Sequence, residues 1–366
     1  MTAYYIIFAF LTFFYLFALL LIYVGLYRLS KEKSTEKPRV SVVVAARNEQ
    51  ENIPDLLAAL LSQHYPENLY EIIIVDDKSE DNTFSLVQSV KDNRIRLLRT
   101  KDRENHASPK KVALDYGIQR AKGEIILLTD ADCRPPVNWI ETMVQHFTTE
   151  TGVVIGFSPY ELPELKSMSD DLFALESMSL AAVTAGTTGW GYPATCSGRN
   201  LAYRKSVYHQ VDGFEHIKHI LSGDDDLFLK LVQKTRWQIR YAFHPASIVP
   251  TFQLKNVQEF IHQRLRHASK SFHYDVSKIA ALSAVYAFNL LIFFSLPLSV
   301  TGILPTLPAL TAFLIKAAAE FILLCRFAFH MNRLFYLRIF PLAELLHIPY
   351  VVIFGTLGPF KSVKWK

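Results

Sequence analysis

The sequence predicts an α/β protein, in which a domain with a mostly parallel sheet lies between apolar helices at the two ends of the chain. Apolar β-branched runs alternate with amphipathic segments between residues 40 and 157, which is typical of a parallel sheet covered by helices on both faces. Long apolar segments lie at residues 4–27 and 279–360. The 366 residues are 50% apolar and 13% aromatic, which excludes a disordered chain.

The first apolar segment predicts a membrane anchor over residues 1–28 rather than a buried core helix. At ~1.5 Å per residue, an uncharged helix of this length crosses the ~30 Å hydrocarbon layer. It lacks the basic start and the cleavage site of a signal peptide, so we expect it to remain on the protein. Five basic residues follow it: Arg28, Lys31, Lys33, Lys37 and Arg39. By the positive-inside rule, the next domain lies in the cytoplasm.

Charge and cysteine content exclude two further classes of protein. A net charge of +5 is modest and does not indicate a nucleic-acid partner. Cys133, Cys196 and Cys325 are widely spaced and odd in number, so we expect neither a disulfide framework nor a cysteine metal site. This pattern agrees with a reducing compartment.

The α/β domain is expected over residues 38–256 and opens with two strand–loop–helix units. Residues 40–45 read as a buried strand, and a helix with apolar positions on one face begins near residue 52. Residues 71–75 read as a second strand that ends at Asp76 in a loop dense in carboxylates. Helices near 84–90 and 110–121 and a short strand at 95–98 continue the pattern. The first strand ends in four residues that form a polar loop: Ala46, Arg47, Asn48 and Glu49.

The stretch from Ile125 to Asp132, IILLTDAD, ends in two carboxylates one residue apart. In a strand, Asp130 and Asp132 would point to the same face. The carboxyl end of a buried strand opens at the crevice where α/β sheets bind ligands. Two hard oxygen ligands there suit a divalent cation and a diphosphate, whereas the simpler alternative is a solvated turn.

A second acidic group occurs at residues 224–226. Before it we expect a helix at 137–147, a strand at 153–157, an amphipathic helix at 165–180, a flexible segment at 186–191 and a strand at 197–203. Asp224, Asp225 and Asp226 precede the apolar helix 227–232, and helix capping explains one of the three. Three adjacent acids repel one another unless a positive group or a proton lies among them.

The remainder of the chain predicts further membrane contact. Residues 257–275 read as a basic amphipathic helix at the membrane surface, and residues 279–360 as a membrane region of two or three apolar spans. Lys316 and Glu320 are four residues apart, so we expect them to pair inside a helix bundle. Prolines and glycines interrupt the last span, which leaves both a full crossing and a re-entrant segment open.

Several blocks in a fixed order resemble one family. From residue 40 to about residue 270 the chain is similar to the inverting glycosyltransferases of family 2, which have the GT-A fold and include ceramide glucosyltransferase-like and cellulose or hyaluronan synthase-like enzymes. The blocks are SVVVAARNEQENI at 41–53, IIIVDDKSEDNT at 72–83, LLTDADCRPP at 127–136, and SGRNLAYRKSVYHQVDGF at 197–214 followed by SGDDDLFLKL at 222–231.

This resemblance implies roles for the polar residues at the strand ends. Asp76 would contact the edge of the uracil, and the loop from Ala46 to Glu49 would line the nucleotide pocket. Lys110 would help to hold the nucleotide and its phosphates. Asp132 would ligate Mg²⁺ or Mn²⁺, with Asp130 close by as a second ligand or ribose contact.

The resemblance also implies a general base within the three aspartates. Alignment on Leu227 favours Asp224, and alignment on Gly223 favours Asp225; we take Asp224 as the first choice. Gln263 and Arg266 match a QxxRW block that contacts the diphosphate, although His267 replaces its tryptophan. That departure argues against a processive polysaccharide synthase.

The function implied is a membrane-bound, metal-dependent transferase that moves one sugar from a UDP-sugar to a lipid or lipid-linked acceptor at the cytoplasmic face of the cell membrane. A polysaccharide synthase and a non-catalytic nucleotide-sugar binding protein are the alternatives. A nucleotidyltransferase would need a glycine-rich phosphate loop after the first strand, and residues 46–49 are not one. The sequence leaves uracil or guanine open for the nucleotide.

Overall fold

The computed structural model describes residues 2–100, 108–160, 167–220, 223–252, 257–268 and 276–358. The chain divides into two compact units. The sheet unit comprises Gly25–Lys166 and Val183–Gln253, and the helical unit comprises Met1–Val24, Ser167–Ala182 and Leu254–Lys366.

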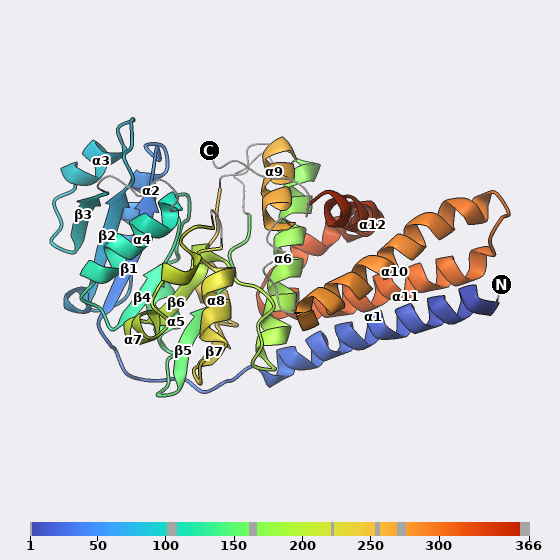
Figure 1. Cartoon of the computed structure of the whole chain (residues 1–366). Coiled ribbons are helices and arrows are strands. Elements are labelled where there is room, and N and C mark those ends of the chain that lie inside the picture. The colour runs from blue at the N-terminus through green and yellow to red at the C-terminus, as the bar shows by residue number, and fades with distance from the viewer. Residues whose placement is uncertain are drawn as a thin grey trace. The chain divides into compact units, whose positions relative to one another are not determined.

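A seven-stranded mixed sheet forms the centre of the sheet unit, in the order β3-β2-β1-β4-β6-β5-β7 (Figure 1). All neighbouring strands are parallel except those that flank β6, which is antiparallel to β4 and β5. This confirms the predicted mostly parallel sheet. The strands are β1 (Val40–Ala46), β2 (Tyr70–Asp76), β3 (Ile95–Arg99), β4 (Ile125–Leu128), β5 (Thr151–Ile155), β6 (Leu201–Arg204) and β7 (Gln238–Tyr241).

Helices cover both faces of this sheet. Leu56 and Leu60 of α2 are fully buried in one apolar cluster with Val42 and Val44 of β1. On the other face, Gly117 of α4 lies so close to β1 that a Cβ there would be 2.7 Å from Val43 Cγ1. The helices of the sheet unit are α2 (Ile53–Leu61), α3 (Thr83–Ser89), α4 (Pro109–Arg120), α5 (Trp139–Val144), α7 (Lys205–Gln210) and α8 (Asp226–Val232).

Two helices, α1 (Thr2–Arg28) and α6 (Met168–Thr188), contribute residues to both units. Within the sheet unit their ends touch through glycines: a Cβ on Gly25 would lie 1.9 Å from the carbonyl oxygen of Gly186, and a Cβ on Gly189 1.9 Å from that of Gly25. Arg28 lies 4.2 Å from the Trp190 ring centroid. The flexible segment expected at 186–191 is therefore helical as far as Thr188, because it packs against α1.

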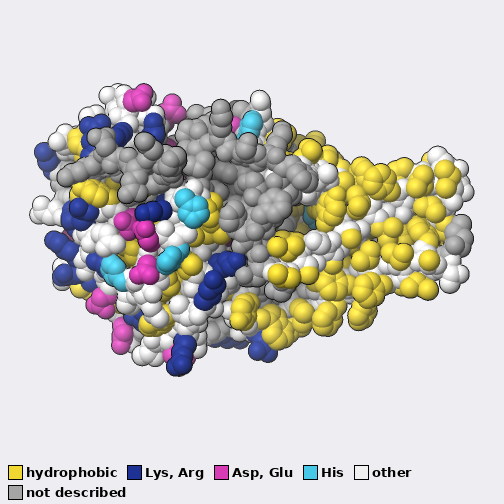
Figure 2. All heavy atoms as spheres, in the orientation of Figure 1, with side chains coloured by type: hydrophobic (Ala, Val, Ile, Leu, Met, Phe, Trp, Pro, Cys, Tyr) yellow, Lys and Arg dark blue, Asp and Glu magenta, His cyan; other side chains and the backbone are white. Residues whose placement is uncertain are grey.

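Four helices are long and apolar enough to cross a membrane: Thr2–Arg28, Lys278–Val300, Thr306–His330 and Leu334–Leu357. Apolar side chains cover the surface of the long helices (Figure 2). These helices indicate that the chain associates with a membrane. The helical unit contains α9 (Val257–Ala268), α10 (Val276–Val300), α11 (Thr306–His330) and α12 (Phe340–Leu357), the last preceded by the 3₁₀ helix η6 (Leu334–Ile339).

The last apolar segment, which contains several prolines and glycines, forms a continuous helix. α12 continues through Pro349 and ends at Leu357. The basic residues beyond it, Lys361, Lys364 and Lys366, lie outside the described residues.

Candidate functional site

The carboxyl ends of β1, β2 and β4 form one edge of the sheet, because the three strands are parallel neighbours. Ala46 and Asp76 are paired in register, and the Asp77 amide donates to the Ala46 carbonyl oxygen at 2.8 Å. The predicted nucleotide loop and the Asp76 loop therefore begin side by side, and the turn after β4 begins at the same edge.

Hydrogen bonds join these first two loops. Asn48, with φ +56°, donates its amide to Ser79 Oγ at 3.0 Å and accepts from the Glu80 amide at 2.9 Å. The Glu49 amide donates to Thr83 Oγ1 at 2.8 Å. Arg47 and Asn48 remain exposed. The loop backbone is thus held in place, while the Arg47 and Asn48 side chains stay accessible to a ligand.

Asp76 itself is fully buried. Its Oδ2 lies 3.2 Å from Arg99 Nε, and its Oδ1 accepts from the Ser79 amide at 3.3 Å. The predicted contact between Asp76 and a nucleobase remains a prediction.

Asp130 and Asp132 lie beyond the end of β4, which stops at Leu128. The expectation that both belong to the strand is wrong, because the chain turns there: the Cys133 amide donates to the Asp130 carbonyl oxygen at 3.1 Å. The two carboxylates consequently have different partners. Asp132 Oδ2 accepts from Thr251 Oγ1 at 2.8 Å, whereas Asp130 Oδ1 lies 2.8 Å from Lys110 Nζ.

Asp132 is an unusual carboxylate for its position. The residue is 6% exposed. Burial raises its pKa above the ordinary value, and the neighbouring Asp130 raises it further. A nearby positive charge would favour the ionised form, so the Asp132 carboxylate is suited to a cation.

Lys110 joins the Asp130 turn to the acidic group before α8. Its Nζ lies 2.8 Å from Asp130 Oδ1 and 3.1 Å from Asp224 Oδ2. Burial alone would lower the pKa of Lys110, but the carboxylates of Asp130 and Asp224 raise it overall. The first turn of α4 thus places one ammonium group between two segments that are about 90 residues apart in the sequence.

The three adjacent aspartates are not equivalent. Asp225 caps α8: its Oδ1 accepts from the Asp226 amide at 2.7 Å, and its Oδ2 accepts from the Gly198 amide at 3.2 Å. Asp226 accepts from Thr195 Oγ1 at 2.5 Å and from the Cys196 amide at 2.9 Å. Asp224 follows Gly223, whose φ of +86° favours glycine. The prediction that capping explains one of these acids is confirmed, and Asp224 faces Lys110.

The segment Ser197–Asn200 belongs to the site, although the sequence pattern pointed to none of its side chains. The expected strand at 197–203 begins only at Leu201, because residues Gly198–Asn200 form the 3₁₀ helix η2. A Cβ on Gly198 would lie 3.0 Å from Asp224 Oδ2 and 3.7 Å from Lys110 Nζ. The signal available in the sequence was Gly198 followed by Arg199, in the block that precedes the three aspartates.

Gln263 and Arg266 lie on α9, in the helical unit. The side chain of Arg266 lies outside the described residues. Next to them, the buried Arg264 pairs with Glu176 of α6 at 2.7 Å. The predicted diphosphate contact of Gln263 and Arg266 remains a prediction.

The charges around the Asp130 turn fit a divalent cation. The charged groups described near this turn include its own two carboxylates, Asp224 and the ammonium of Lys110. Carboxylate oxygens are the ligands that Mg²⁺ and Mn²⁺ prefer. Asp132 and Asp130 are the residues that could hold such an ion.

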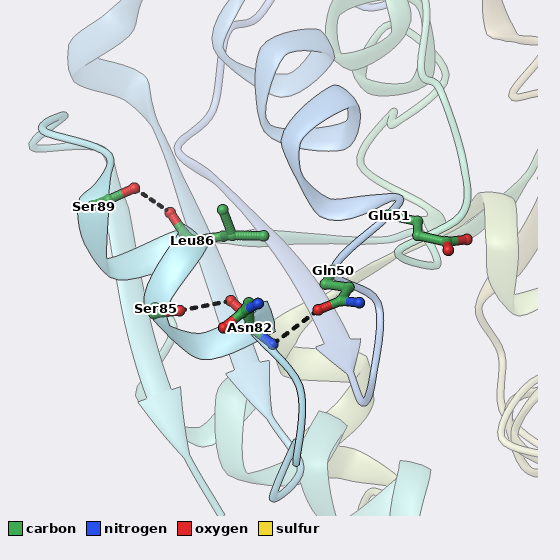
Figure 3. A pocket seen from close by; sticks show the side chains of 6 residues that line it. All are labelled: Gln50, Glu51, Asn82, Ser85, Leu86 and Ser89. Atoms are coloured by element: carbon green, nitrogen blue, oxygen red, sulfur yellow. Dashed lines mark hydrogen bonds between the residues drawn. The ribbon is translucent and has the colours of Figure 1, made fainter.

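A shallow depression of about 520 Å³ lies beside the nucleotide loop. Figure 3 shows that it is lined by two residues that follow β1 and by α3, and that the Asn82 amide donates to Gln50 Oε1. Its lining is largely uncharged and includes none of the carboxylates of the Asp130 turn or of residues 224–226. The chemistry therefore points to the carboxylates around Lys110 and not to this depression.

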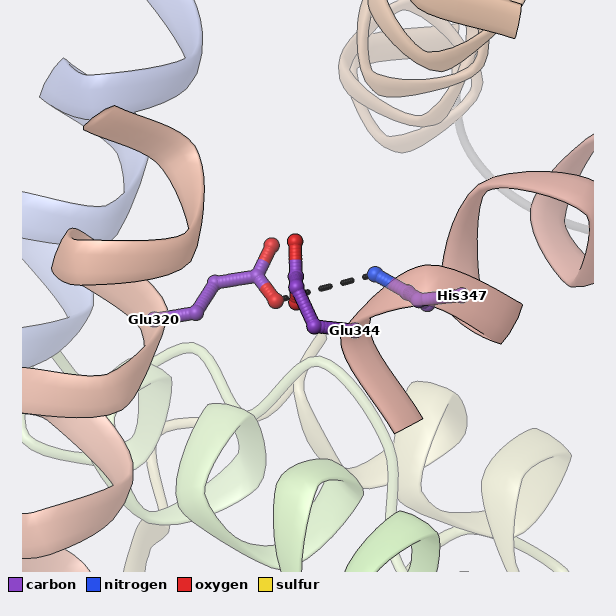
Figure 4. A group of neighbouring side chains, drawn as sticks. All are labelled: Glu320, Glu344 and His347. Atoms are coloured by element: carbon purple, nitrogen blue, oxygen red, sulfur yellow. Dashed lines mark ion pairs between the residues drawn. The ribbon is translucent and has the colours of Figure 1, made fainter. Parts of the chain in front are cut away.

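A second group of potential metal ligands lies in the helical unit. Glu320, Glu344 and His347 point toward one another (Figure 4), with ligand atoms within 4.8 Å. The fully buried Lys316 lies among them, with Nζ 2.8 Å from Glu320 and 2.5 Å from Glu344. The predicted pair of Lys316 and Glu320 is confirmed. Because lysine already supplies the positive charge, this group is an internal ion-pair network.

Comparisons with known proteins agree with this geometry. Residues 41–211 match the sequence model described as glycosyl transferase family 2. The chain is 28% identical to the probable glycosyltransferase YdaM of Bacillus subtilis over 65% of its length and 56% of that protein. It is 29% identical to a beta-monoglucosyldiacylglycerol synthase of Synechocystis over 31% of its length and 24% of that protein. The chain therefore spans about half, or less, of the length of these relatives.

The fold is also similar to that of a solved structure. The mannosyltransferase PcManGT from Pyrobaculum calidifontis, in complex with GDP-Man and Mn²⁺, superposes with a TM-score of 0.59 at 19% identity, over 94% of this chain and 99% of that one. Identity at this level supports the fold alone. Together with the family match, it shows that the chain contains a glycosyl transferase family 2 domain with a GT-A-like α/β fold.

Proposed function

We propose that the chain is a membrane-bound, metal-dependent, inverting glycosyltransferase that transfers one sugar from a UDP-sugar to a lipid or lipid-linked acceptor at the cytoplasmic face of the membrane. The observation that carries this proposal is the double contact of Lys110. It brings the Asp130 turn, a candidate metal and diphosphate site, next to Asp224, a candidate base.

Asp224 is the base in this proposal. Asp225 and Asp226 already accept backbone hydrogen bonds that shape α8 and residues 195–198. Asp224 accepts the proton of the acceptor hydroxyl while the hydroxyl oxygen attacks the anomeric carbon from the side opposite the diphosphate. The bond from that carbon to the diphosphate oxygen breaks, the electron pair leaves with the diphosphate, and the configuration inverts.

Asp132 and Asp130 hold Mg²⁺ or Mn²⁺ in this proposal. Such an ion, when bound, neutralises the charge that develops on the leaving diphosphate. PcManGT, whose structure is a complex with GDP-Man and Mn²⁺, supports this choice of cation. The chain's own part is to keep the Asp132 carboxylate buried and oriented by Thr251.

The nucleotide lies at the loop from Ala46 to Glu49 and near Asp76. Parallel strand ends and the crosslinked loops support this placement. Because the PcManGT structure contains GDP-Man, guanine nucleotides have to be tested beside uracil nucleotides.

A lipid acceptor is supported by four apolar helices and by similarity to beta-monoglucosyldiacylglycerol synthases. Helices that associate with a membrane would keep the transferase close to acceptors dissolved in that membrane. The basic residues after α1 support a cytoplasmic position of the sheet unit.

The binding test uses the full chain in detergent, with the unfolding temperature measured against UDP-glucose, UDP-GlcNAc, UDP-galactose and GDP-mannose, each with and without Mn²⁺. A ligand at 100 times its Kd stabilises by about 2.7 kcal/mol. We expect one nucleotide sugar to raise the unfolding temperature in a Mn²⁺-dependent way. No effect from any of them would refute the proposed function.

The turnover test compares Asp224→Asn, Asp225→Asn and, as a control, Asp212→Asn. Asp212 is exposed and has φ +56°, a conformation that asparagine tolerates. We expect Asp224→Asn to lower kcat by about 10²- to 10⁴-fold, as for loss of a general base, with nucleotide binding retained. Unchanged turnover in Asp224→Asn would exclude this base, and a ladder of oligomeric products would exclude single transfer.

A further inference from the structure

Arg199 is held at the acidic site by its two neighbours in the chain. On one side, the Gly198 amide donates to Asp225 Oδ2 at 3.2 Å, and Gly198 lies against Asp224. On the other side, the fully buried Asn200 donates from Nδ2 to the carbonyl oxygens of Phe157 and Ser247 at 2.8 and 2.7 Å. The backbone of residue 199 therefore has little freedom to move.

The guanidinium group of Arg199 is fixed by uncharged partners. Its Nε donates to Ser197 Oγ at 3.2 Å, its Nη2 donates to the Ser158 carbonyl oxygen at 3.4 Å, and its Cζ lies 4.7 Å from the centroid of the Tyr160 ring. Arginine carries five N–H donors in a planar fork. Two of them have these partners in the described part of the chain, so donors remain for a ligand.

Acidic groups are among the electrostatic surroundings of Arg199. Burial alone would lower the pKa of Arg199, but Tyr160, Cys133, Asp132 and Asp130 raise it overall. The partners described for its guanidinium are nevertheless a hydroxyl, a carbonyl and a ring. Because the described partners of its guanidinium are neutral, Arg199 can bind an anion at the Asp130 turn.

We propose that Arg199 binds the diphosphate of the donor and stabilises the negative charge that it gains as the bond to the sugar breaks. This inference rests on the proposed function. A planar guanidinium matches the geometry of phosphate oxygens. Lys110 already has two carboxylate partners, whereas the described partners of the Arg199 guanidinium are uncharged. Arg199 can therefore offer its positive charge to the diphosphate.

The test compares Arg199→Met, Arg199→Lys and the control Arg204→Met. Arg204 is held in a similar way, by the carbonyl oxygens of Thr151 and Thr148 at 2.9 and 2.8 Å and by aromatic rings. It lies at the opposite end of β6, away from the Asp130 turn. The Arg204→Met control therefore shows what the loss of a packed arginine does by itself, without the loss of an anion contact.

Binding of UDP and of UMP is measured by titration calorimetry with Mn²⁺ on the full chain in detergent, with GDP and GMP in parallel. We expect Arg199→Met to weaken diphosphate binding by about 10- to 100-fold, the usual range for a hydrogen bond to a charged group, and monophosphate binding by less than about threefold. Arg199→Lys, which keeps the charge but loses the fork, should fall between wild type and Arg199→Met. Arg204→Met should leave the ratio of diphosphate to monophosphate affinity unchanged.

Equal losses for UDP and UMP in both Arg199 variants, or no loss in either, would overturn the role of Arg199. If Arg199→Met does not fold, Arg199→Lys decides: an unchanged ratio of UDP to UMP affinity would also overturn it. If the wild-type chain binds no nucleotide at all, the proposed function itself fails. If the wild-type chain binds nucleotide and the Arg199 variants keep its preference for UDP over UMP, only this inference is refuted.

Discussion

Replacement of Lys110 by methionine tests the centre of the site. The substitution keeps the apolar stem of the side chain and removes the ammonium that contacts both Asp130 and Asp224. These carboxylates, whose side chains are 30% and 12% exposed, would then face each other unpaired.

The expected cost follows from the geometry. Two oxygens within about 3 Å of one nitrogen lie at most ~6 Å apart, where two charges repel by ~3 kcal/mol at an effective dielectric constant of ~20. Partial exposure reduces this to ~1–2 kcal/mol. We expect Lys110→Met to lower the free energy of unfolding by that amount at pH 7.5.

The contribution of Lys110 to stability depends on pH in a definite direction. Because the pKa of Lys110 is raised in the folded chain, its contribution is complete below the ordinary lysine pKa and is lost only as the pH rises through the raised value. Wild type therefore keeps it between pH 5 and 8. We therefore expect the cost of Lys110→Met to be present throughout that pH range.

The assay is thermal unfolding of the full chain in detergent at pH 7.5 and 5.5, with and without Mn²⁺. Lys37→Met is the matched control, because Lys37 forms a more exposed pair with Glu141 at 3.1 Å and such pairs contribute about 0–1 kcal/mol. Mn²⁺ should restore more stability to Lys110→Met than to the control. Equal unfolding temperatures for wild type and Lys110→Met at both pH values would refute this reasoning.

Three further predictions concern the packing around the site and the helices. Gly198→Ala should lower turnover by about 10-fold with little change in folding. Its Cβ would lie 3.0 Å from Asp224 Oδ2 and would displace the carboxylate of the proposed base. An unchanged kcat would contradict this prediction. Burial, with Lys33 and other cations, lowers the pKa of His146 to about 4, so stability present above pH 6.5 should fall by up to ~3 kcal/mol as the pH drops toward 4. His146→Phe should flatten that pH profile of unfolding, and an equally steep profile would count against it. Lys316→Met should destabilise by ~3–5 kcal/mol by leaving Glu320 and Glu344 unpaired, and adding Glu344→Gln should recover part of the unfolding temperature.

Much of the fold follows from local patterns. The strands β1 and β2 are apolar β-branched runs, and the apolar face of α2 shows the helical period, so each element can be recognised without knowledge of its neighbours. The end of β4 could not be placed in this way. Thr129 to Asp132 continue the alternation of a strand, but the hydrogen bond from Thr251, over a hundred residues later, holds a turn there.

The candidate site shows the same division. Acidic residues at strand ends and before α8 are visible in the sequence, because their charge is unusual next to apolar runs. Which aspartate caps α8 and which faces Lys110 depends on the approach of Gly198, and the position of Arg199 depends on Ser158 and Tyr160. These contacts are made between distant segments, and no local periodicity encodes them.

The glycine contact between α1 and α6 has a consequence for which residues the sheet unit tolerates there. Gly25 and Gly186 meet backbone to backbone, so no side chain lies between the two helix ends. The last turn of an apolar helix is thus a packed part of the sheet unit. A side chain at position 25 or 189 would collide with the opposing backbone, so this contact closes only while both residues remain glycine.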